Sequence, residues 1–258
     1  TMGNRRVVVW FSNGATSAVA WKLAVQEFGS ERVVAALCDT GSEHPDNHRF
    51  GREVSEWVGQ PLTVLKSDKY DDIWEVYSKT RFLVGPAGAR CTTELKKKLR
   101  QDFQRPDDIH VFGYDAGESD RVEKFRHNNP ELELWLPLLD RGLDKSACLS
   151  IISDAGIEIP EMYKLGYGHN NCLACPKGGM GYWNKIRKDF PHLFDRMARV
   201  ERELGRNICN KEKIENGKRV KIPVFLDELS PDDGRYEDEP KMSCDFLCGI
   251  VSDEINNK

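Results

Sequence analysis

The stretch from Val7 to Ser17, VVVWFSNGATS, constrains the fold more than any other part of the chain. Its apolar residues run into a short polar turn, and apolar side chains then recur at helical spacing from Ala18 to Phe28, which predicts a strand, a loop and a helix. Gly14 lets the backbone approach a ligand closely, and the unpaired amides at a helix start favour an anion. Hydroxyls that can donate to this anion belong to Ser12, Thr16 and Ser17. The stretch therefore predicts an anion site, with a plain turn capped by Thr16 or Ser17 as the alternative.

Composition and charge exclude several classes of protein. The chain has 258 residues with 38 basic and 42 acidic side chains, so its overall charge does not indicate a nucleic-acid partner. No apolar run approaches the roughly 20 residues of a membrane span, and the start TMGNRR lacks a signal-peptide core. We predict a cytoplasmic protein without membrane contact, in which residues 1–200 form the core domain and residues 201–258 a C-terminal extension.

Alternating strand and helix patterns predict an α/β fold. Arg32 to Cys38 is a continuous apolar run, as in a parallel strand that is covered on both faces. Further strands are expected at residues 61–65, 109–112 and 134–139. Helices are expected at residues 47–58 and 70–81, from a cap at Thr92 or Thr93 through Leu99, and at 144–155 between Asp144 and Gly156. Together these elements predict a Rossmann-like parallel sheet flanked by helices.

Polar side chains gather directly after the predicted strands. Asp39, Thr40 and Glu43 follow the second strand, and a later strand opens into a charged loop with candidates Glu118, Arg121 and Arg126. Because ligands of parallel sheets bind at the carboxyl ends of strands, we expect these groups to meet the ligand of the first loop. For the charged loop, a solvated helix start is the alternative.

A basic run is the only sequence signal for a polyanionic partner. Lys96, Lys97 and Lys98 are consecutive, and Arg100 follows. The run is either a solvated helix face or a positive rim for phosphates or a nucleic acid.

Cysteine spacing predicts a metal site. Eight cysteines without a secretory signal favour a metal or redox role over a disulfide framework. Cys172 and Cys175 have the C-x-x-C spacing, which lets two thiolates reach one metal, and the glycines that let the backbone fold tightly around them are Gly178, Gly179 and Gly181. A second pair, Cys244 and Cys248, would complete four ligands for zinc or a four-iron cluster. Unligated core cysteines are the alternative.

The remaining cysteines do not add to this site. Cys38 and Cys148 lie in apolar stretches and are expected in the core. Cys209 has no evident partner in a polar, Pro- and Gly-punctuated stretch from residue 206 to 239, which we expect to be a partly ordered excursion.

The motifs together resemble the phosphoadenosine phosphosulfate (PAPS) reductase family of the PP-loop, or adenine nucleotide α-hydrolase-like, superfamily. The resemblance spans about residues 5–200. The segments that carry it are Ser12–Ser17 in the place of the PP-loop, Asp39–Gly41, Cys91–Lys96, Gly113–Arg121, and Leu165–Tyr167 ahead of Cys172 and Cys175.

The resemblance implies an adenine nucleotide at the sheet edge, with phosphates on the PP-loop and adenosine near Asp39 and Thr40. The implied nucleotide-binding residues are Ser12, Asn13, Gly14, Thr16, Ser17, Asp39, Thr40, Glu43, Gly113, Glu118 and Arg121. In iron-sulfur members, a tandem cysteine pair upstream of the C-x-x-C motif completes a 4Fe-4S cluster. Here Cys91 is followed by Thr92, so Cys244 or Cys248 would supply the fourth ligand beside Cys91, Cys172 and Cys175.

Two departures from the family pattern bear on the reaction. ATP pyrophosphatases carry Ser-Gly-Gly-x-Asp-Ser, whereas Asn13 and Thr16 stand in place of a glycine and the aspartate, leaving the frame Ser-x-Gly-x-x-Ser. The C-terminal Glu-Cys-Gly-Leu-His of the reductases is also missing, because the tail offers only Ser243-Cys244-Asp245 and Cys248-Gly249-Ile250.

Three functions are compatible with these residues. The first is ATP-dependent adenylation followed by sulfur transfer, with Cys91 or an iron-sulfur cluster carrying the sulfur, Mg²⁺ as an optional cofactor and tRNA or DNA as the candidate acceptor. The second is reductive release of sulfite from an adenylyl sulfate. The third is a non-catalytic nucleotide-binding module with structural zinc. The oligomeric state is left open, with a homodimer as one option.

Overall fold

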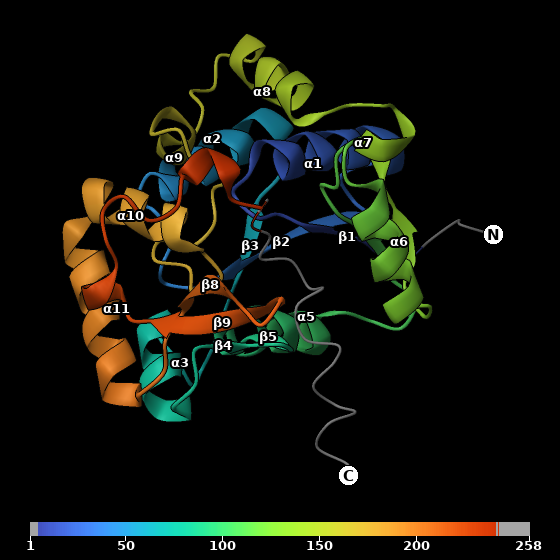
Figure 1. Ribbon diagram of the computed structural model, residues 1–258. Helices are drawn as coiled ribbons and strands as arrows, with labels where there is room; N and C mark the ends of the chain where they lie inside the picture. Colours follow the sequence, from blue (N-terminus) through green and yellow to red (C-terminus); the bar gives the residue numbers. More distant parts are fainter. Residues whose placement is uncertain (1–4, 241, 243–258) are drawn as a thin grey trace. The chain divides into compact units, whose positions relative to one another are not determined.

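The computed structural model describes residues 5–240 and 242 of the chain (Figure 1). Its internal contacts divide the chain into two compact units. Unit 1 consists of Thr1–Lys69 and Leu95–Asn171, and unit 2 of Tyr70–Glu94 and Cys172–Lys258. The predicted division into a core domain of residues 1–200 and a C-terminal extension of residues 201–258 that returns to the metal site stays a prediction.

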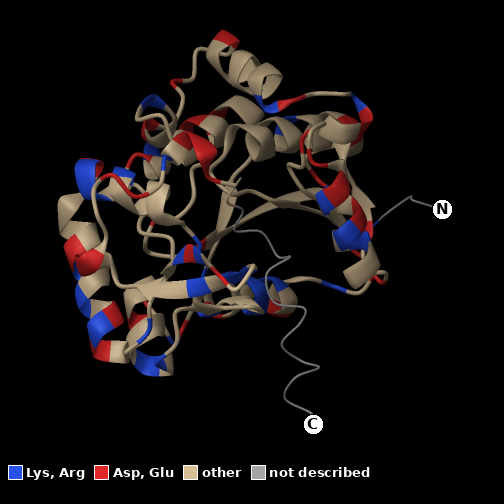
Figure 2. Ribbon diagram, in the orientation of Figure 1, with Lys and Arg blue, Asp and Glu red and all other residues tan. Residues whose placement is uncertain are grey.

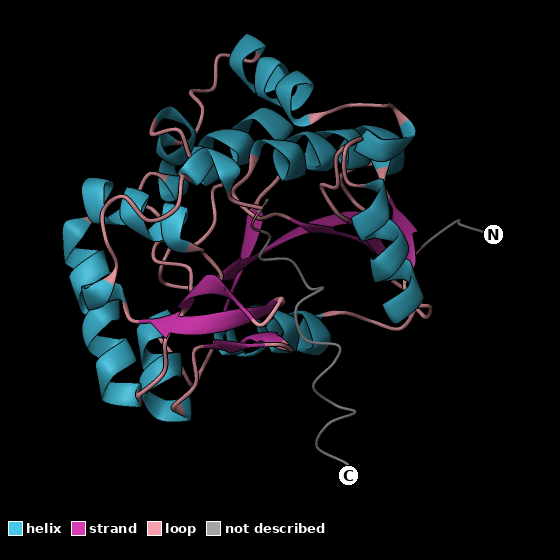
Figure 3. Cartoon of the chain, viewed as in Figure 1, coloured by secondary structure: helices cyan, strands magenta, loops and turns pink. Residues whose placement is uncertain are grey.

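A parallel sheet, whose strands are magenta in Figure 3, forms the centre of unit 1. Its strand order is β3-β2-β1-β6-β7. Its strands are β1 (Val7–Trp10), β2 (Val33–Asp39), β3 (Leu62–Lys66), β6 (Ile109–Val111) and β7 (Glu133–Trp135). β1 lies between β2 and β6 with Val7 opposite both Val33 and Ile109. The strand order reverses direction at β1, which confirms the predicted Rossmann-like α/β class; in such sheets ligands bind at the carboxyl ends of the strands beside this reversal.

Helices cover both faces of this sheet. Val7, Val9, Ile109 and Val111 point into a core built with α1 (Ala15–Phe28), α2 (Asn47–Val58), α7 (Pro137–Asp140) and α8 (Lys145–Asp154). On the opposite face the rings of Trp10 and Phe112 contact Phe103 of α5 (Lys98–Phe103) and Phe125 of α6 (Ser119–Asn128). Because both of its faces are buried, the central strand β1 is a continuous apolar run, and its neighbour β2 is mostly apolar as the sequence indicated, whereas the edge strands β3 and β7 are partly exposed.

Helix boundaries confirm one cap and correct two others. Asp144 caps α8 by accepting a hydrogen bond from the Ala147 amide at 2.8 Å. Thr92 and Thr93 cap nothing, because the helix begins earlier, at α4 (Arg90–Thr92), and continues through the π-helical turn η1 (Thr93–Lys97) into α5. The predicted strand at 134–139 is also too long, because Pro137 occupies the first turn of α7, a position that suits its fixed φ.

Unit 2 is mostly helical. It contains α3 (Ile73–Thr80), the short pair β4 (Val84–Gly85) and β5 (Gly88–Ala89), α4, α10 (Met180–Asp189), α11 (Pro191–Leu204), η2 (Leu226–Glu228) and η3 (Tyr236–Asp238). The Arg196 guanidinium of α11 lies 4.3 Å from the centre of the Trp74 ring of α3. Among the residues that the structure describes, no helix has the length and apolar character of a membrane span.

The expected partly ordered excursion at 206–239 is wrong for its first half. Residues 209–224 form a regular antiparallel hairpin of β8 (Cys209–Glu215) and β9 (Lys218–Val224). Cys209 is buried at its base, and burial raises the pKa of its thiol to about 12. Cys38 and Cys148 are buried as predicted.

The buried His110 predicts how the stability of unit 1 depends on pH. The Trp10 indole donates to its Nδ1 at 3.1 Å, and burial lowers the pKa of His110 to about 4, against 6.5 in an unfolded chain. Below pH 6.5 the unfolded state binds the proton first, so the free energy of unfolding should fall between pH 6.5 and 4, by up to about 3 kcal/mol. Urea unfolding at several pH values measures this.

His110→Gln is the matched variant for this prediction, because it keeps an acceptor for Trp10 and does not titrate. Its pH curve should be flatter than that of the parent without being level, since burial and the Lys145 charge lower the pKa of His169 to about 4 as well. Identical curves for parent and variant would contradict the assignment.

Candidate functional site

The loop between β1 and α1 has the geometry of an anion site. Gly14 is the N-cap residue of α1, with φ −98° and ψ 157°. Because glycine has no side chain, no side-chain hydrogen bond caps the helix. The first amides of α1 therefore begin directly at the carboxyl edge of the sheet, where a helix start favours negative charge. Ser12 is exposed and Thr16 half-buried, so their hydroxyls are the ones accessible beside these amides.

Ser17 holds the loop rather than facing solvent. Its hydroxyl is buried, donates to the Gly14 carbonyl at 3.1 Å and accepts from the Ser12 amide at 3.1 Å. The Ser12 and Ser17 hydroxyl oxygens are 3.2 Å apart. The retained serine of the Ser-x-Gly-x-x-Ser frame thus fixes the curvature of the loop.

Asn13 occupies a glycine position of the PP-loop pattern because its backbone is left-handed. Its φ is +58°, a region that Gly adopts freely and Asn tolerates better than other side chains. Its Nδ2 donates to the Glu43 Oε2 at 2.9 Å. The Asn13 side chain also packs closely against Gly51 of α2: a Cβ at position 51 would lie 3.1 Å from the Asn13 Oδ1, which is a tight contact.

A buried amide network supports Asn13. Glu43 Oε2 also accepts from Asn47 at 2.8 Å, and the Asn170 Nδ2 donates to the Asn13 carbonyl and to the Asn47 Oδ1, both at 2.7 Å. Asn13, Asn47 and Asn170 are each 4% exposed. Glu43, predicted to contact the nucleotide, is therefore engaged in positioning the loop. Asn47 and Asn170 were missed by sequence reasoning because only the fold brings residue 170 to residue 13.

Substitution of Asn13 measures how the loop uses its left-handed residue. Asn13→Gly keeps the backbone conformation but loses the bond to Glu43, and should lower the free energy of unfolding by about 1 kcal/mol. Asn13→Ala loses that bond and also strains φ, so about 2–3 kcal/mol is expected. Urea unfolding of the two variants gives the order; an alanine variant as stable as the glycine variant would contradict the role of φ.

Gly113, directly beyond β6, is required by a close backbone approach. A Cβ there would lie 2.5 Å from the Ser17 amide nitrogen and 2.7 Å from its Cα. No side chain fits against the first turn of α1, so the 113–118 loop and the anion loop form one packed structure.

Other predicted residues at this edge have mainly local partners. The Asp39 Oδ1 accepts from the Gly41 amide at 2.8 Å, which shapes the loop after β2, and Thr40 is buried. Glu118 accepts from the Asp115 amide at 3.0 Å and pairs with Arg121, whose guanidinium lies 5.5 Å from the Tyr114 ring centre. These loops all follow the strand ends that the sequence indicated.

Tyr163 and Lys145 are further residues at the start of α1 that sequence reasoning missed. The Ala15 amide hydrogen-bonds to the Tyr163 hydroxyl, and burial raises the pKa of this phenol to about 12. The Lys145 ammonium lies 4.6 Å from the Tyr163 ring centre. A neutral phenol and a cation therefore stand beside the first amide of the anion loop, and only the tertiary fold reveals them.

The basic run is not one solvated face. Lys96 and Arg100 are buried, Lys97 is half-buried and Lys98 is exposed. Burial lowers the pKa of Arg100, while Glu131, Tyr114 and Cys38 act in the opposite direction. Of these groups, Cys38 and Tyr114 lie near the carboxyl ends of β2 and β6, whereas Glu131 precedes β7 at the amino edge.

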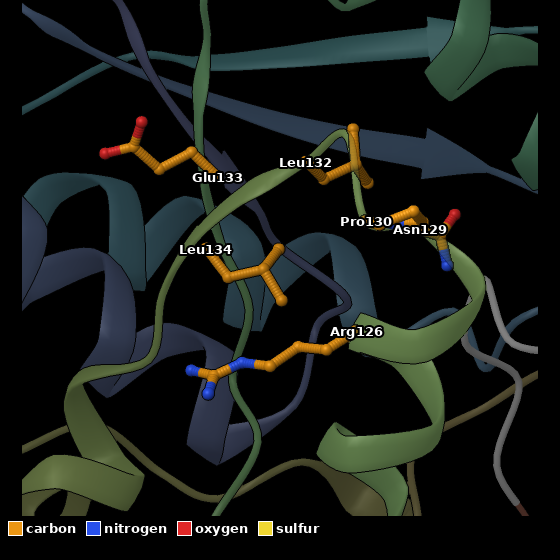
Figure 4. A pocket seen from close by; sticks show the side chains of 6 residues that line it. All are labelled: Arg126, Asn129, Pro130, Leu132, Glu133 and Leu134. Atoms are coloured by element: carbon orange, nitrogen blue, oxygen red, sulfur yellow. The ribbon is translucent and has the colours of Figure 1, made fainter.

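A pocket of about 330 Å³ elsewhere in unit 1 is a separate feature (Figure 4). The pocket lies between the end of α6 and the start of β7. The residues that line it are Arg126, Asn129, Pro130, Leu132, Glu133 and Leu134. This is the amino edge of the parallel sheet, opposite to the strand ends that bind ligands. Arg126, a predicted polar candidate, thus lines this pocket.

Three of the predicted metal ligands surround one phenol in unit 2. Tyr77 donates to the Cys91 Sγ at 3.5 Å. Burial raises the pKa of Tyr77 well above its ordinary value, and the charges of Cys91, Cys175 and Cys172 act in the same direction. All three cysteines are buried. Within the described ranges, however, no three His, Cys, Asp or Glu side chains are arranged to hold a metal ion, and Cys244 and Cys248 lie outside the described residues.

The glycines after the C-x-x-C motif bind a carboxylate. The Glu239 side chain accepts from the amides of Gly179, Gly181 and Tyr182 at 3.1, 2.8 and 3.3 Å. These amides belong to the start of α10, whose dipole favours negative charge. Gly178 is needed because a Cβ would lie 2.0 Å from the Tyr182 ring.

Glu239→Ala should expose these three amides. We expect a loss of about 1–2 kcal/mol in the free energy of unfolding of unit 2 and faster amide hydrogen exchange at residues 179–182. Glu237→Ala is the control, because Glu237 is exposed and its ion pair with the exposed Arg235 is long, at 3.8 Å. Equal exchange in both variants would show that the carboxylate does not order the helix start.

Comparisons with known proteins leave the activity open. No family model matches the chain. An uncharacterized protein of Methanocaldococcus jannaschii is 24% identical over 200 residues, 76% of this chain, and an uncharacterized nin region protein of Escherichia phage lambda is 44% identical over 62 residues, 24% of this chain. The chain spans only 42% and 21% of the length of these relatives.

A solved structure of the family that the sequence motifs resemble is also similar to the chain. It is the phosphoadenylyl-sulfate (PAPS) reductase from Candida auris in a phosphate complex, 14% identical, with a TM-score of 0.48 over 66% of this chain and 81% of that one.

Proposed function

We propose that unit 1 binds an adenine nucleotide and that the protein is a PP-loop enzyme of sulfur chemistry. The observation that carries the proposal is the anion loop: amides at the start of α1, the accessible hydroxyls of Ser12 and Thr16, and a left-handed Asn13, all at the strand-order reversal. A nucleotide phosphate is the ligand class that such a loop suits best.

ATP-dependent sulfur transfer is the reaction that we favour. A substrate oxygen attacks the α-phosphorus of ATP and pyrophosphate leaves, with the loop amides stabilising its charge. The terminal sulfur of a persulfide, for which Cys91 is the candidate carrier, then displaces AMP from the adenylated substrate, and an external dithiol cleaves the resulting disulfide to free the product and the Cys91 thiol. The acceptor is a nucleic acid in this proposal. The retained Ser17 of the motif frame favours ATP, and the incomplete C-terminal motif counts against the reduction of an adenylyl sulfate.

The proposed metal centre would use Cys91, Cys172, Cys175 and one of Cys244 and Cys248. Thiolates are the donors that a 4Fe-4S cluster or zinc takes, and Cys91, Cys172 and Cys175 all act on the Tyr77 phenol, although the described side chains are not arranged as a metal site. A cluster would supply electron or sulfur chemistry, whereas zinc would be structural. Metal analysis and an absorption spectrum of protein purified without air separate the two; zinc without visible absorbance would exclude the cluster.

Calorimetry with ATP, AMP and adenylyl sulfate tests the nucleotide proposal. Ser12→Ala and Thr16→Ala should weaken ATP binding, and Ser12→Ala should also lower the unfolding midpoint slightly, because it removes the hydrogen bond between the Ser12 and Ser17 hydroxyls. Formation of AMP and pyrophosphate with a nucleic-acid acceptor would support transfer. Release of sulfite from adenylyl sulfate with a thiol would support the reductase instead.

A non-catalytic module is the second candidate, favoured by Thr16 in place of the pattern's aspartate. In that case the protein should bind ATP tightly but form no AMP from it, with its metal intact and candidate RNA or DNA present. Thr16→Asp tests the residue directly, since gain of pyrophosphate release would identify the threonine as the cause.

A further inference from the structure

The β8–β9 hairpin is a regular ribbon with a turn of its own. Seven residue pairs join the strands, from Cys209–Val224 to Glu215–Lys218. The two turn residues, Asn216 and Gly217, have φ of +50° and +75°, as in the tight turn that matches strand twist. Its pairing register is therefore fixed.

The base of the hairpin is fixed to α11 by a buried carboxylate. Glu201 is fully buried, and its two oxygens accept from the amides of Ile208 and Leu226, each at 2.6 Å. These amides lie just before β8 and just after β9. Cys209 and Val224 are buried at the same end. The ribbon thus projects from a rigid base.

Beyond its base the ribbon is uncovered on both faces. Every residue from 210 to 223 is exposed except the half-buried Lys211. Three aliphatic side chains are among them: Ile214 is 73% exposed, Val220 38% and Ile222 40%. A lone two-stranded ribbon gains little stability in water, so an exposed aliphatic surface on it indicates a partner.

The hairpin is basic in an acidic chain. Residues 209–224 hold five basic side chains, Lys211, Lys213, Lys218, Arg219 and Lys221, against Glu212 and Glu215, while the chain has a net charge of −4 (Figure 2). Some are moderated by exposed ion pairs, such as Lys213 with Glu215 at 3.0 Å. Such pairs contribute little and exchange readily for phosphates.

The register places the lysines around the aliphatic residues. Lys211 is opposite Ile222, and Lys213 is opposite Val220. Cross-strand partners share a face, and so do alternate residues along a strand, which adds Lys218. One face therefore carries two aliphatic side chains among three ammonium groups and the carboxylate of Glu215, and the Lys211 ammonium is paired with Asp233 at 2.7 Å.

We propose that this face of the hairpin enters the major groove of duplex DNA. The groove, about 12 Å wide, admits a two-stranded ribbon, its phosphates suit the lysines, and thymine methyl groups suit Val220 and Ile222. The deep, narrow major groove of duplex RNA excludes such a ribbon. The inference rests on the proposed function in that it names the acceptor polymer, and it concerns unit 2 alone.

Fluorescence polarisation with a labelled duplex of about two helical turns tests the proposal. Lys213→Ala/Lys218→Ala removes two phosphate contacts and should make the slope of log K against log salt less steep by about 1.8. The ratio of the parent's DNA affinity to that of the variant should therefore fall about 12-fold between 50 and 200 mM salt. Val220→Ser/Ile222→Ser should weaken binding at every salt concentration without changing the slope.

The control is Lys188→Ala/Arg199→Ala, which removes the same charge from exposed positions on α10 and α11 and should bind DNA as the parent does. Circular dichroism checks folding, and ATP calorimetry on each variant keeps a failure of the nucleotide proposal distinguishable, since DNA binding is measured without nucleotide. A parent that does not bind DNA, a lysine variant with the parental slope, or tighter binding to duplex RNA of the same sequence would each overturn the inference.

Discussion

Gly113→Ala is expected to abolish detectable nucleotide binding and to destabilise unit 1. The new Cβ would lie within 2.8 Å of three backbone atoms of Thr16 and Ser17, and backbone cannot rotate away as a side chain can. The first turn of α1 must then move, and with it the amides that form the anion loop. We expect a loss of about 1–3 kcal/mol in the free energy of unfolding, the range for overpacking, and a loss of at least about 100-fold in ATP affinity.

Gly14→Ala is the matched control for this prediction. Gly14 has a negative φ, and its nearest neighbour to a new Cβ is the Tyr163 hydroxyl at 3.4 Å, an ordinary contact. Urea unfolding should find this variant close to the parent, while calorimetry reports any clash with the ligand itself. If Gly113→Ala is as stable as Gly14→Ala and binds ATP equally well, the packing of the 113–118 loop on α1 does not shape the site.

The sheet and the anion loop could be predicted because their signals are local. A buried parallel strand is a short apolar run, and the turn after Trp10 announces itself through Gly14 and the hydroxyls around it. The position of the ligand edge followed from the parallel topology alone. The motif could not show that Ser17 and Glu43 face inward, because their partners are set by the backbone curvature and by α2.

Contacts between distant residues could not be predicted from the pattern. Asn170 and Tyr163 reach the anion loop from far along the chain, and nothing in their neighbourhood marks them as its partners. The hairpin is different, because Asn216-Gly217 between two runs containing Ile214 and Val220 is a known turn signal. The hairpin was nevertheless not predicted, because these runs are rich in charged residues. Both faces of the ribbon are exposed, so its sequence shows no alternation of apolar and polar residues.

Glu201→Ala is expected to destabilise unit 2 strongly. It leaves the Ile208 and Leu226 amides without their acceptor, at about 1–3 kcal/mol for each buried amide, and so about 2–6 kcal/mol in all. The hairpin base should open, which trypsin detects because β9 carries Lys218, Arg219 and Lys221. Urea unfolding and the rate of tryptic cleavage at these sites are the measurements.

Glu203→Ala, two residues along the same helix, is the control. Its carboxylate is 63% exposed and pairs with an exposed Arg81 at 3.0 Å, an arrangement worth less than about 1 kcal/mol. If both variants lose the same stability, the two hydrogen bonds from the Ile208 and Leu226 amides to Glu201 do not hold the base of the hairpin in place.

Ionisation of Glu201 makes the stability of the hairpin base depend on pH, in the direction opposite to the effect of His110 on unit 1. Burial raises the pKa of Glu201 to about 7, despite the two amides that favour its ionised form, against 4.5 in an unfolded chain. Its contribution to stability is therefore complete below pH 4.5 and is lost as the pH rises through 7. Glu201→Gln cannot titrate, so its unfolding free energy should not show this loss, although its amide group leaves one backbone donor unmatched. Hydrogen exchange followed separately at the hairpin base and in the sheet should then show unit 2 weakening, and unit 1 strengthening, over the interval from pH 4.5 to 6.5. Parallel trends in the two units would mean that the buried carboxyl and the buried imidazole do not govern them.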